Sequence, residues 1–193
     1  MNEFVETVSS PEQVLSFWFG ELTQEDWFQP DDVAALDHTI LCRFFSTHRA
    51  LARDVGAVWR ASPQAHLAAV IVLDQFPRNI YRATPMAFAT DMLALREAKL
   101  AVASGAHEKV DADRRAFFFM PFEHSENLAD QDRSVALFAT LGDDNFSSYA
   151  ESHRDVIARF GRFPHRNPIL KRRSTRAELA YLAADENTGW GQK

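Results

Sequence analysis

The chain is poor in the residues and segments that build disulfide-linked or membrane-spanning proteins. Its single cysteine, Cys42, excludes an internal disulfide, and no apolar stretch approaches the roughly 20 residues that span a bilayer. Cys42 lies in the apolar-periodic segment LDHTILCRFF, which favours a buried, inert thiol. The N-terminal residues MNEFVETVSS are acidic, unlike a secretory or mitochondrial leader. These features predict a cytoplasmic protein without a membrane partner.

Familiar phosphate-binding and catalytic motifs are also missing. The sequence has neither GxxxxGK(S/T) nor GxGxxG, and it lacks the GxSxG of a serine nucleophile elbow. His107-Glu108 begins like HExxH but lacks the second histidine, and no Glu-x-x-His pair is present to build a di-metal centre. We therefore expect neither a metal nor another cofactor.

Positive charge is scarce outside one segment. The formal net charge is −6, which argues against a nucleic-acid partner, because nucleic-acid binding depends on neutralising many phosphates with Lys and Arg. Residues 159–176, RFGRFPHRNPILKRRSTR, nevertheless hold seven of the 21 Lys and Arg and no acidic residue. A solvated basic loop is the simplest interpretation of Lys171, Arg172, Arg173 and Arg176.

Apolar residues are abundant enough for a packed core. Hydrophobic residues make up 46% of the 193 positions, with 16 Phe and 4 Trp. A chain of this length buries roughly 70% of its unfolded surface on folding and needs no disulfide or metal for stability. We expect a single helical domain over residues 1–193, with only the residues after Trp190 loose.

Helix start signals recur along the chain. Ser10-Pro11, Ser62-Pro63 and Thr84-Pro85 each place a capping hydroxyl before a proline at the first helical position, and Thr175 can form a capping box with Glu178. Together with the helical spacing of apolar residues, these signals predict about eight helices, at 11–20, 32–55, 63–76, 85–104, 112–121, 125–141, 145–160 and 175–184. Their inward stripes are expected to include Val33, Met92, Leu128 and Tyr149.

The segment 63–76 is ambiguous by composition, because AVIVLD resembles a buried strand that ends in Asp74. A helix is favoured, since Ser62-Pro63 starts it well before Phe76 and no second strand is visible to pair with its backbone groups. Short connections between successive helices favour antiparallel neighbours. The expected fold class is therefore all-α, with the helices in stacked antiparallel hairpins.

Three of these helices carry a polar side chain where a core residue is expected. Asp74, Gln131 and His153 each fall on the inward stripe of their helix. An unpaired buried polar group costs on the order of 1–3 kcal/mol, so these residues should contact each other or residues in the turns. The residues expected to form one shared cluster are Asp74, Gln75, Arg78, Asn79, Glu123, His124, Glu126, Gln131, His153, Arg162, His165, Arg166 and Asn167.

Two functional interpretations of this cluster compete with a purely structural one, in which Arg–carboxylate pairs only tie helix ends together. The main hypothesis is a non-catalytic module that binds a small anionic or polar molecule, or a peptide, because Arg and His beside helix starts suit carboxylate and phosphate groups. The alternative is a hydrolase. In it, Glu123 or Asp74 acts as a base and His124 or His153 acts as an acid or a metal ligand.

An interaction role through exposed aromatic residues is a further possibility. Trp18, Trp27 and Phe28 lie close together near the N-terminus and could form an exposed apolar patch for a protein partner. Core or helix-capping positions are favoured for all three.

Four segments together resemble a known family. VLSFWFGE at 14–21, VLDQFPRNIYR at 72–82, FFMPFEHSE at 118–126 and RFGRFPHRNPIL at 159–170 are similar, in the same order, to a bacterial family catalogued as domain of unknown function 924. The resemblance implies a helical fold like that of tetratricopeptide-repeat proteins, a right-handed superhelical array. It implies no activity, substrate or catalytic residue. The family commonly has Gly where this chain has Lys171, so the loop there is expected to differ in shape or charge.

Overall fold

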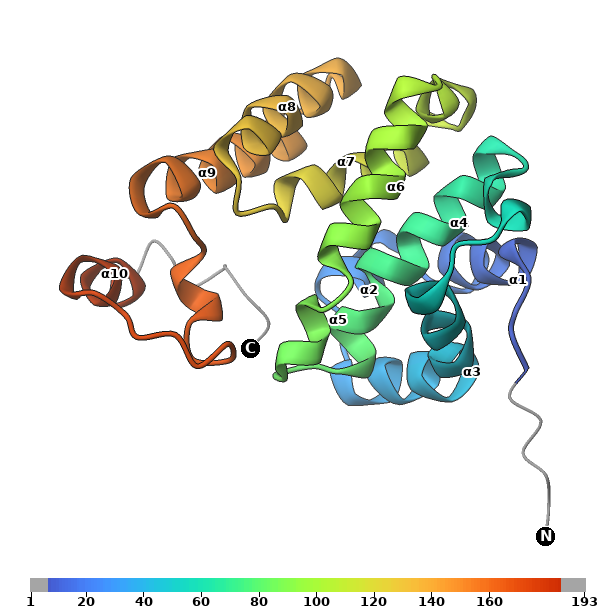
Figure 1. Cartoon of the computed structure of the whole chain (residues 1–193), viewed down its shortest axis with the longest axis horizontal. Helices are drawn as coiled ribbons and strands as arrows, with labels where there is room; N and C mark the ends of the chain where they lie inside the picture. The colour runs from blue at the N-terminus through green and yellow to red at the C-terminus, as the bar shows by residue number, and fades with distance from the viewer. Residues whose placement is uncertain (1–6, 185–193) are drawn as a thin grey trace, which may run out of the picture.

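A computed structural model describes residues 7–184, and within them every regular element is helical (Figure 1). The α-helices are α1 (Pro11–Ser16), α2 (Gln24–Phe28), α3 (Val33–Arg53), α4 (Pro63–Asp74), α5 (Phe76–Ile80), α6 (Asp91–Ala103), α7 (Ala112–Glu123), α8 (Leu128–Phe138), α9 (Asp144–Phe160) and α10 (Arg176–Leu182). The all-α fold class is confirmed for this part of the chain. The residues after Trp190 lie outside it.

Local capping interactions begin several helices where the sequence predicts. Ser10 and Thr175 each complete a capping box, and the Ser62 hydroxyl accepts the backbone N–H of the third residue of α4. Thr84-Pro85 differs, because it starts only a 3-10 turn at Pro85–Phe88, and α6 follows at Asp91. The Thr84 hydroxyl donates backwards to the Tyr81 carbonyl and therefore caps no helix.

The ambiguous segment AVIVLD forms the central helix of the molecule. α4 packs against α1, α3, α6 and α7, and every residue from Ala65 to Asp74 is buried. A helix covered on all sides has no polar face, which explains why its composition resembles that of a buried strand. The helical assignment of this segment is confirmed.

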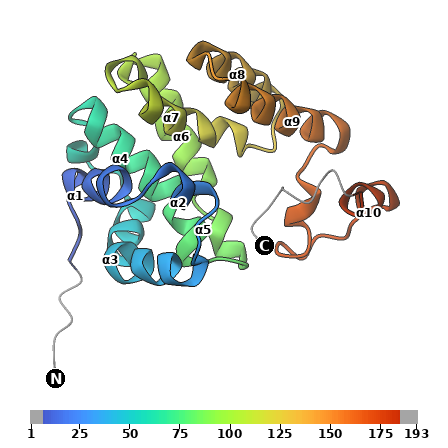
Figure 2. The ribbon, with the colours of Figure 1, turned by 180° about the vertical axis from the view of Figure 1, so that it is seen from behind.

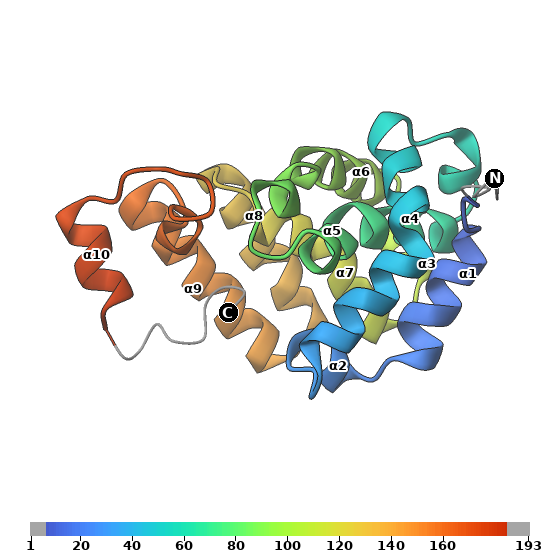
Figure 3. The same ribbon diagram turned by 90° about the horizontal axis from the view of Figure 1, so that it is seen from below.

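Successive helices pack as neighbours along the chain. α6 contacts α7, α7 contacts α8, and α8 contacts α9, which lies beside α8 in Figure 1. Seen from behind, α1 lies over α4, with which it is in contact (Figure 2). Figure 3 shows α10 at the opposite end of the molecule from α1. The right-handed superhelical array stays a prediction.

Two hydrophobic clusters divide the described part of the chain unequally. The main core combines buried residues of α1, α3, α4, α6, α7 and α8. A small second cluster at the end of α9 consists of Val156, Ile157 and Phe163, with Phe160 and Tyr181 packed against it. No helix within residues 7–184 has the length and apolar character needed to cross a bilayer.

Several inward assignments from the sequence are wrong. Val33, Met92, Leu128 and Tyr149 are all exposed, Met92 at 74% of its surface. Cys42 is exposed as well, because α3 buries the face that carries Ile40 and Phe44, and a residue two positions from each lies on the opposite side of a helix. The expected buried thiol is therefore a surface thiol.

The N-terminal aromatic residues belong mostly to the core. Trp18 is buried, and its ring stacks on that of Trp27 at 6.2 Å. The indole N–H of Trp27 donates a hydrogen bond to the backbone carbonyl of Trp18, so Trp27 also caps that carbonyl oxygen. Phe28 is 48% exposed and touches Phe146 edge-on. These contacts favour the core interpretation for the two tryptophans.

Candidate functional site

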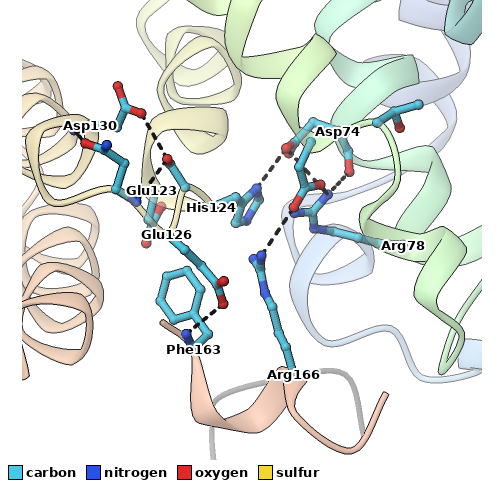
Figure 4. Close-up of polar contacts among 12 residues, drawn as sticks. Asp74, Arg78, Glu123, His124, Glu126, Asp130, Phe163 and Arg166 are labelled. Carbon is cyan, nitrogen blue, oxygen red and sulfur yellow. Dashed lines mark hydrogen bonds and ion pairs between the residues drawn. The ribbon is translucent and has the colours of Figure 1, made fainter. Parts of the chain in front are cut away.

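Polar side chains from distant parts of the chain meet where α4 and α7 end. Figure 4 shows Asp74 and Arg78 on one side, Glu123 and His124 on another, and Arg166 reaching between them from the C-terminal segment. Arg166 belongs to the 3-10 turn Pro164–Arg166, which follows α9. The structure brings these residues together, and a ligand-binding role for them stays a prediction.

Asp74 holds His124 in a fixed orientation. Asp74 is the last residue of α4 and only 1% exposed, and its Oδ1 lies 2.8 Å from Nδ1 of His124 at the end of α7. Burial alone would raise the pKa of Asp74, but Arg78 and His124 outweigh it and hold the pKa below its usual value. An ionised carboxylate only accepts hydrogen bonds, so Nδ1 of His124 carries the proton. Nε2 then bears the lone pair of the neutral ring.

Asp91 is shared by two arginines. Its Oδ1 lies 3.1 Å from Nη1 of Arg78, and its Oδ2 lies 3.3 Å from Nη1 of Arg166. Arg78 also pairs with Asp74 at 3.4 Å and donates to its backbone carbonyl. Together with Asp74, these three side chains join the end of α4, α5, the start of α6 and the C-terminal segment.

Arg166 is a buried cation with incomplete pairing. Its residue is 7% exposed, and its guanidinium carbon lies 4.6 Å from the ring centroids of both Phe88 and Phe163. Its Nε is buried and has no hydrogen-bond partner in the described part of the chain. Burial lowers the pKa of Arg166 to about 10, Asp91 opposes this shift, and Arg78 adds to it. The stabilisation from its surroundings is thus smaller than the cost of its burial.

Asp91 was missed by the sequence argument although a signal was present. The inward stripe of α6 runs through Ala94, Leu95 and Ala98, all buried. Asp91 precedes these residues by three, four and seven positions, so it continues the stripe. The spacing of apolar residues in the sequence predicts Met92 on this stripe instead, one position away from Asp91.

Glu123 and His153 form a second carboxylate–imidazole pair. Nδ1 of His153 lies 2.7 Å from Oε1 of Glu123 and 2.8 Å from the backbone carbonyl of Tyr149. Both partners are acceptors, so Nδ1 carries the proton here too. The His153 side chain is 18% exposed and packs edge-on against Phe163, so it lies at the rim of the core rather than inside it.

Glu126 anchors the C-terminal segment. Its carboxylate accepts a hydrogen bond from the backbone N–H of Phe163 at 2.8 Å. It also forms a bidentate salt bridge with Arg172, with N···O distances of 2.6 and 2.9 Å. The solvated loop expected at Arg172 is therefore wrong for that residue, because the chain turns back and brings it onto α7–α8. His165 lies beside this pair, and burial, with smaller contributions from Arg166 and His153, lowers its pKa to about 3. His165 is thus neutral near neutral pH.

The other candidate residues have partners of their own. Gln75 donates to Oδ2 of Asp74, and Asn79 donates to Asp37. Gln131 donates to backbone carbonyls at the end of α7, and Asn167 accepts from Arg172. Arg162 forms a bidentate salt bridge with Glu178 of α10. These contacts tie helix ends and loops together.

The described residues also bear on metal binding. Within residues 7–184, no group of three or more His, Cys, Asp and Glu side chains is arranged to hold a metal ion. Asp74 and Glu123 instead each hold one histidine. The arrangement supplies two oriented imidazoles beside two buried guanidiniums, which is suited to holding an anion and exchanging a proton next to it.

The family match and the structural match agree with this fold. Residues 14–186 match the model of a family described as bacterial protein of unknown function, DUF924. The solved structure of a protein of unknown function from Agrobacterium tumefaciens is similar over 90% of this chain and 96% of its own, with 40% sequence identity and a TM-score of 0.84. No curated protein matches the sequence.

Proposed function

The chain belongs to the bacterial family of unknown function DUF924, and because that name assigns no activity, we propose one from the site: the protein binds a small monoanionic carboxylate at Arg166 and Arg78, beside His124. The observation that carries this proposal is the buried Nε of Arg166, which has no partner within residues 7–184. A buried donor without an acceptor is costly, and a ligand carboxylate would supply the acceptor.

The balance of charge favours a single negative charge on the ligand. The formal charges at the cluster come from four carboxylates and three guanidiniums, namely Asp74, Asp91, Glu123 and Glu126 against Arg78, Arg166 and Arg172. With neutral histidines this sum is already negative. A dianionic phosphate would add two negative charges to this sum, whereas a monoanion adds only one.

Calorimetry with monomethyl succinate, succinate and inorganic phosphate tests this proposal. We expect monomethyl succinate to bind more tightly than the two more highly charged ligands. A peptide with a free C-terminal carboxylate, next to its amidated form, tests the peptide interpretation in the same assay. No detectable binding of any monoanion would overturn the proposal.

A matched pair of variants locates the site. Arg166→Lys keeps the positive charge but removes the Nε donor, so we expect monomethyl succinate affinity to fall about 10–100-fold, the value of one charge-assisted hydrogen bond. Arg162→Lys makes the same change in the same basic segment, at an arginine bound to Glu178, and should leave the affinity unchanged. Equal losses in both variants would argue against the assigned site.

A further inference from the structure

We propose that the site also catalyses a reaction: His124, oriented by Asp74, acts as a general base in the hydrolysis of a carboxylic ester whose acyl group carries a second, anionic carboxylate. This inference rests on the proposed function, because the arginines must first hold that carboxylate. It adds a chemical step and a substrate class to the same site.

The geometry of His124 meets the requirements for a general base. A buried carboxylate fixes one ring nitrogen, as is needed to keep the imidazole in one tautomer and orientation. The other nitrogen, Nε2, makes no hydrogen bond within residues 7–184 and is not among the buried atoms there that lack a partner, so it is open to solvent. With 18% of its side chain exposed, His124 can therefore present its lone pair to a water molecule.

The nearest hydroxyl in the chain is occupied, and the single thiol has a contact of its own. Ser125 follows His124 directly, but its hydroxyl donates to Oδ2 of Asp130 at 2.9 Å. Cys42 lies on the exposed face of α3, beside His38. Water is therefore the nucleophile that the arrangement favours over a side chain.

The reaction can be written without a cofactor. His124 Nε2 takes a proton from water as the water oxygen bonds to the ester carbonyl carbon. The tetrahedral intermediate then breaks the bond between carbon and the alkoxy oxygen, and the leaving alcohol takes the proton back from Nε2. The products are the free dicarboxylic acid and the alcohol, and His124 returns to its neutral form.

The formal negative charge of the cluster favours a substrate with one negative charge over a phosphate monoester. A phosphate monoester would bring a dianion into a cluster that is already formally negative with neutral histidines, whereas an ester with one carboxylate brings a single charge. Arg166 and Arg78 would hold that carboxylate near His124, since all three side chains belong to the cluster around Asp74 and Asp91.

Hydrolysis of mono(4-nitrophenyl) succinate tests the inference, with neutral 4-nitrophenyl butyrate as the control ester. The carboxylate of the anionic ester speeds its own spontaneous hydrolysis, so kcat/KM is divided by the uncatalysed rate of each ester. We expect this ratio to be at least about 10-fold larger for the anionic ester, the effect of one charge-assisted contact. Monomethyl succinate belongs to the proposed substrate class itself, so it should inhibit hydrolysis of the aryl ester by competition and should itself be converted to succinate and methanol. Equal turnover of both esters would overturn the inference.

The variant His124→Gln separates catalysis from binding. It should lower kcat about 10²–10⁴-fold and change KM little, because a general base acts on the chemical step. His38→Gln, an exposed histidine on α3, should leave both constants unchanged. If His124→Gln fails to fold, the ester preference and the inhibition by monomethyl succinate still decide the matter in the unmodified protein. Monomethyl succinate binding without ester hydrolysis would overturn this inference alone, whereas absence of binding would overturn the proposed function as well.

Discussion

Arg166 donates a hydrogen bond of 3.3 Å to Asp91, a residue 75 positions earlier in the chain. This contact ties the basic segment 159–176 to the start of α6. Two more arginines of the segment pair with acidic residues, Arg162 with Glu178 and Arg172 with Glu126. Arg166 and Arg172 therefore dock the C-terminal segment, whose own hydrophobic cluster is small, whereas Arg162 ties α10 to the rest of that segment.

Asp91→Asn should destabilise the protein by about 1–3 kcal/mol, because two mostly buried arginines would lose the carboxylate that they share. The measurement is urea denaturation followed by circular dichroism. Asp111→Asn is the matched control: Asp111 pairs with Arg114 at 3.6 Å but is 78% exposed, so its loss should cost less than about 1 kcal/mol. Equal costs would show that the shared carboxylate contributes no more than a surface pair.

Gln131→Leu should cost about 2–3 kcal/mol despite its similar volume. The Gln131 amide is fully buried and donates to the carbonyls of Glu123 and Ser125 at 2.6 and 2.7 Å, and leucine would leave these carbonyls without that donor. Gln64→Leu, an exposed change in α4, should stay within about 0.5 kcal/mol. Thermal and chemical unfolding give the two values, and a small effect at Gln131 would mean that water replaces the amide.

Stability should fall as the pH is lowered from 6.5 towards 4. Burial lowers the pKa of His48 to about 4 and that of His165 to about 3, from the ordinary 6.5. In this window the unfolded chain binds protons that the folded chain does not. Each histidine therefore lowers the free energy of unfolding by up to about 1.4 kcal/mol for each unit by which the pH falls. His48→Gln should reduce the slope of unfolding free energy against pH. An unchanged slope would show that His48 is charged in the folded protein.

Lys171→Gly should stabilise the protein by up to about 1 kcal/mol, because Lys171 has a φ of 54°, in the left-handed region that glycine adopts without strain. The gain is limited by the larger chain entropy of glycine in the unfolded state. Lys171→Ala keeps the strained conformation and should change the melting temperature little. Lys171 therefore holds a backbone conformation that glycine would adopt at lower cost.

Cys42 should react with Ellman's reagent in the native protein, without denaturant, because its side chain is exposed. One thiol per chain is expected to react, and none in Cys42→Ser. A native protein whose thiol reacts only after unfolding would restore the original expectation of a buried cysteine.

The helices themselves were largely predictable because their signals are local. Capping by Ser10, Ser62 and Thr175 uses hydrogen bonds within the first turn, which the sequence displays directly. The same holds for the inward direction of Asp74 and Gln131, each on a well-defined apolar stripe. Predictions failed at Met92, one position off the buried stripe of α6, and at Tyr149, an exposed position of α9.

The sequence by itself determined that this protein is all-α, where most of its helices begin, and that polar residues at the ends of α4 and α7 point towards a common region. Only the tertiary structure decided which of them meet. The bonds from His124 to Asp74 and from Arg166 to Asp91 join residues 50 and 75 positions apart. Periodicity fixes the face on which a side chain lies, but its partner depends on how whole helices pack against one another, and that packing is a property of the complete core.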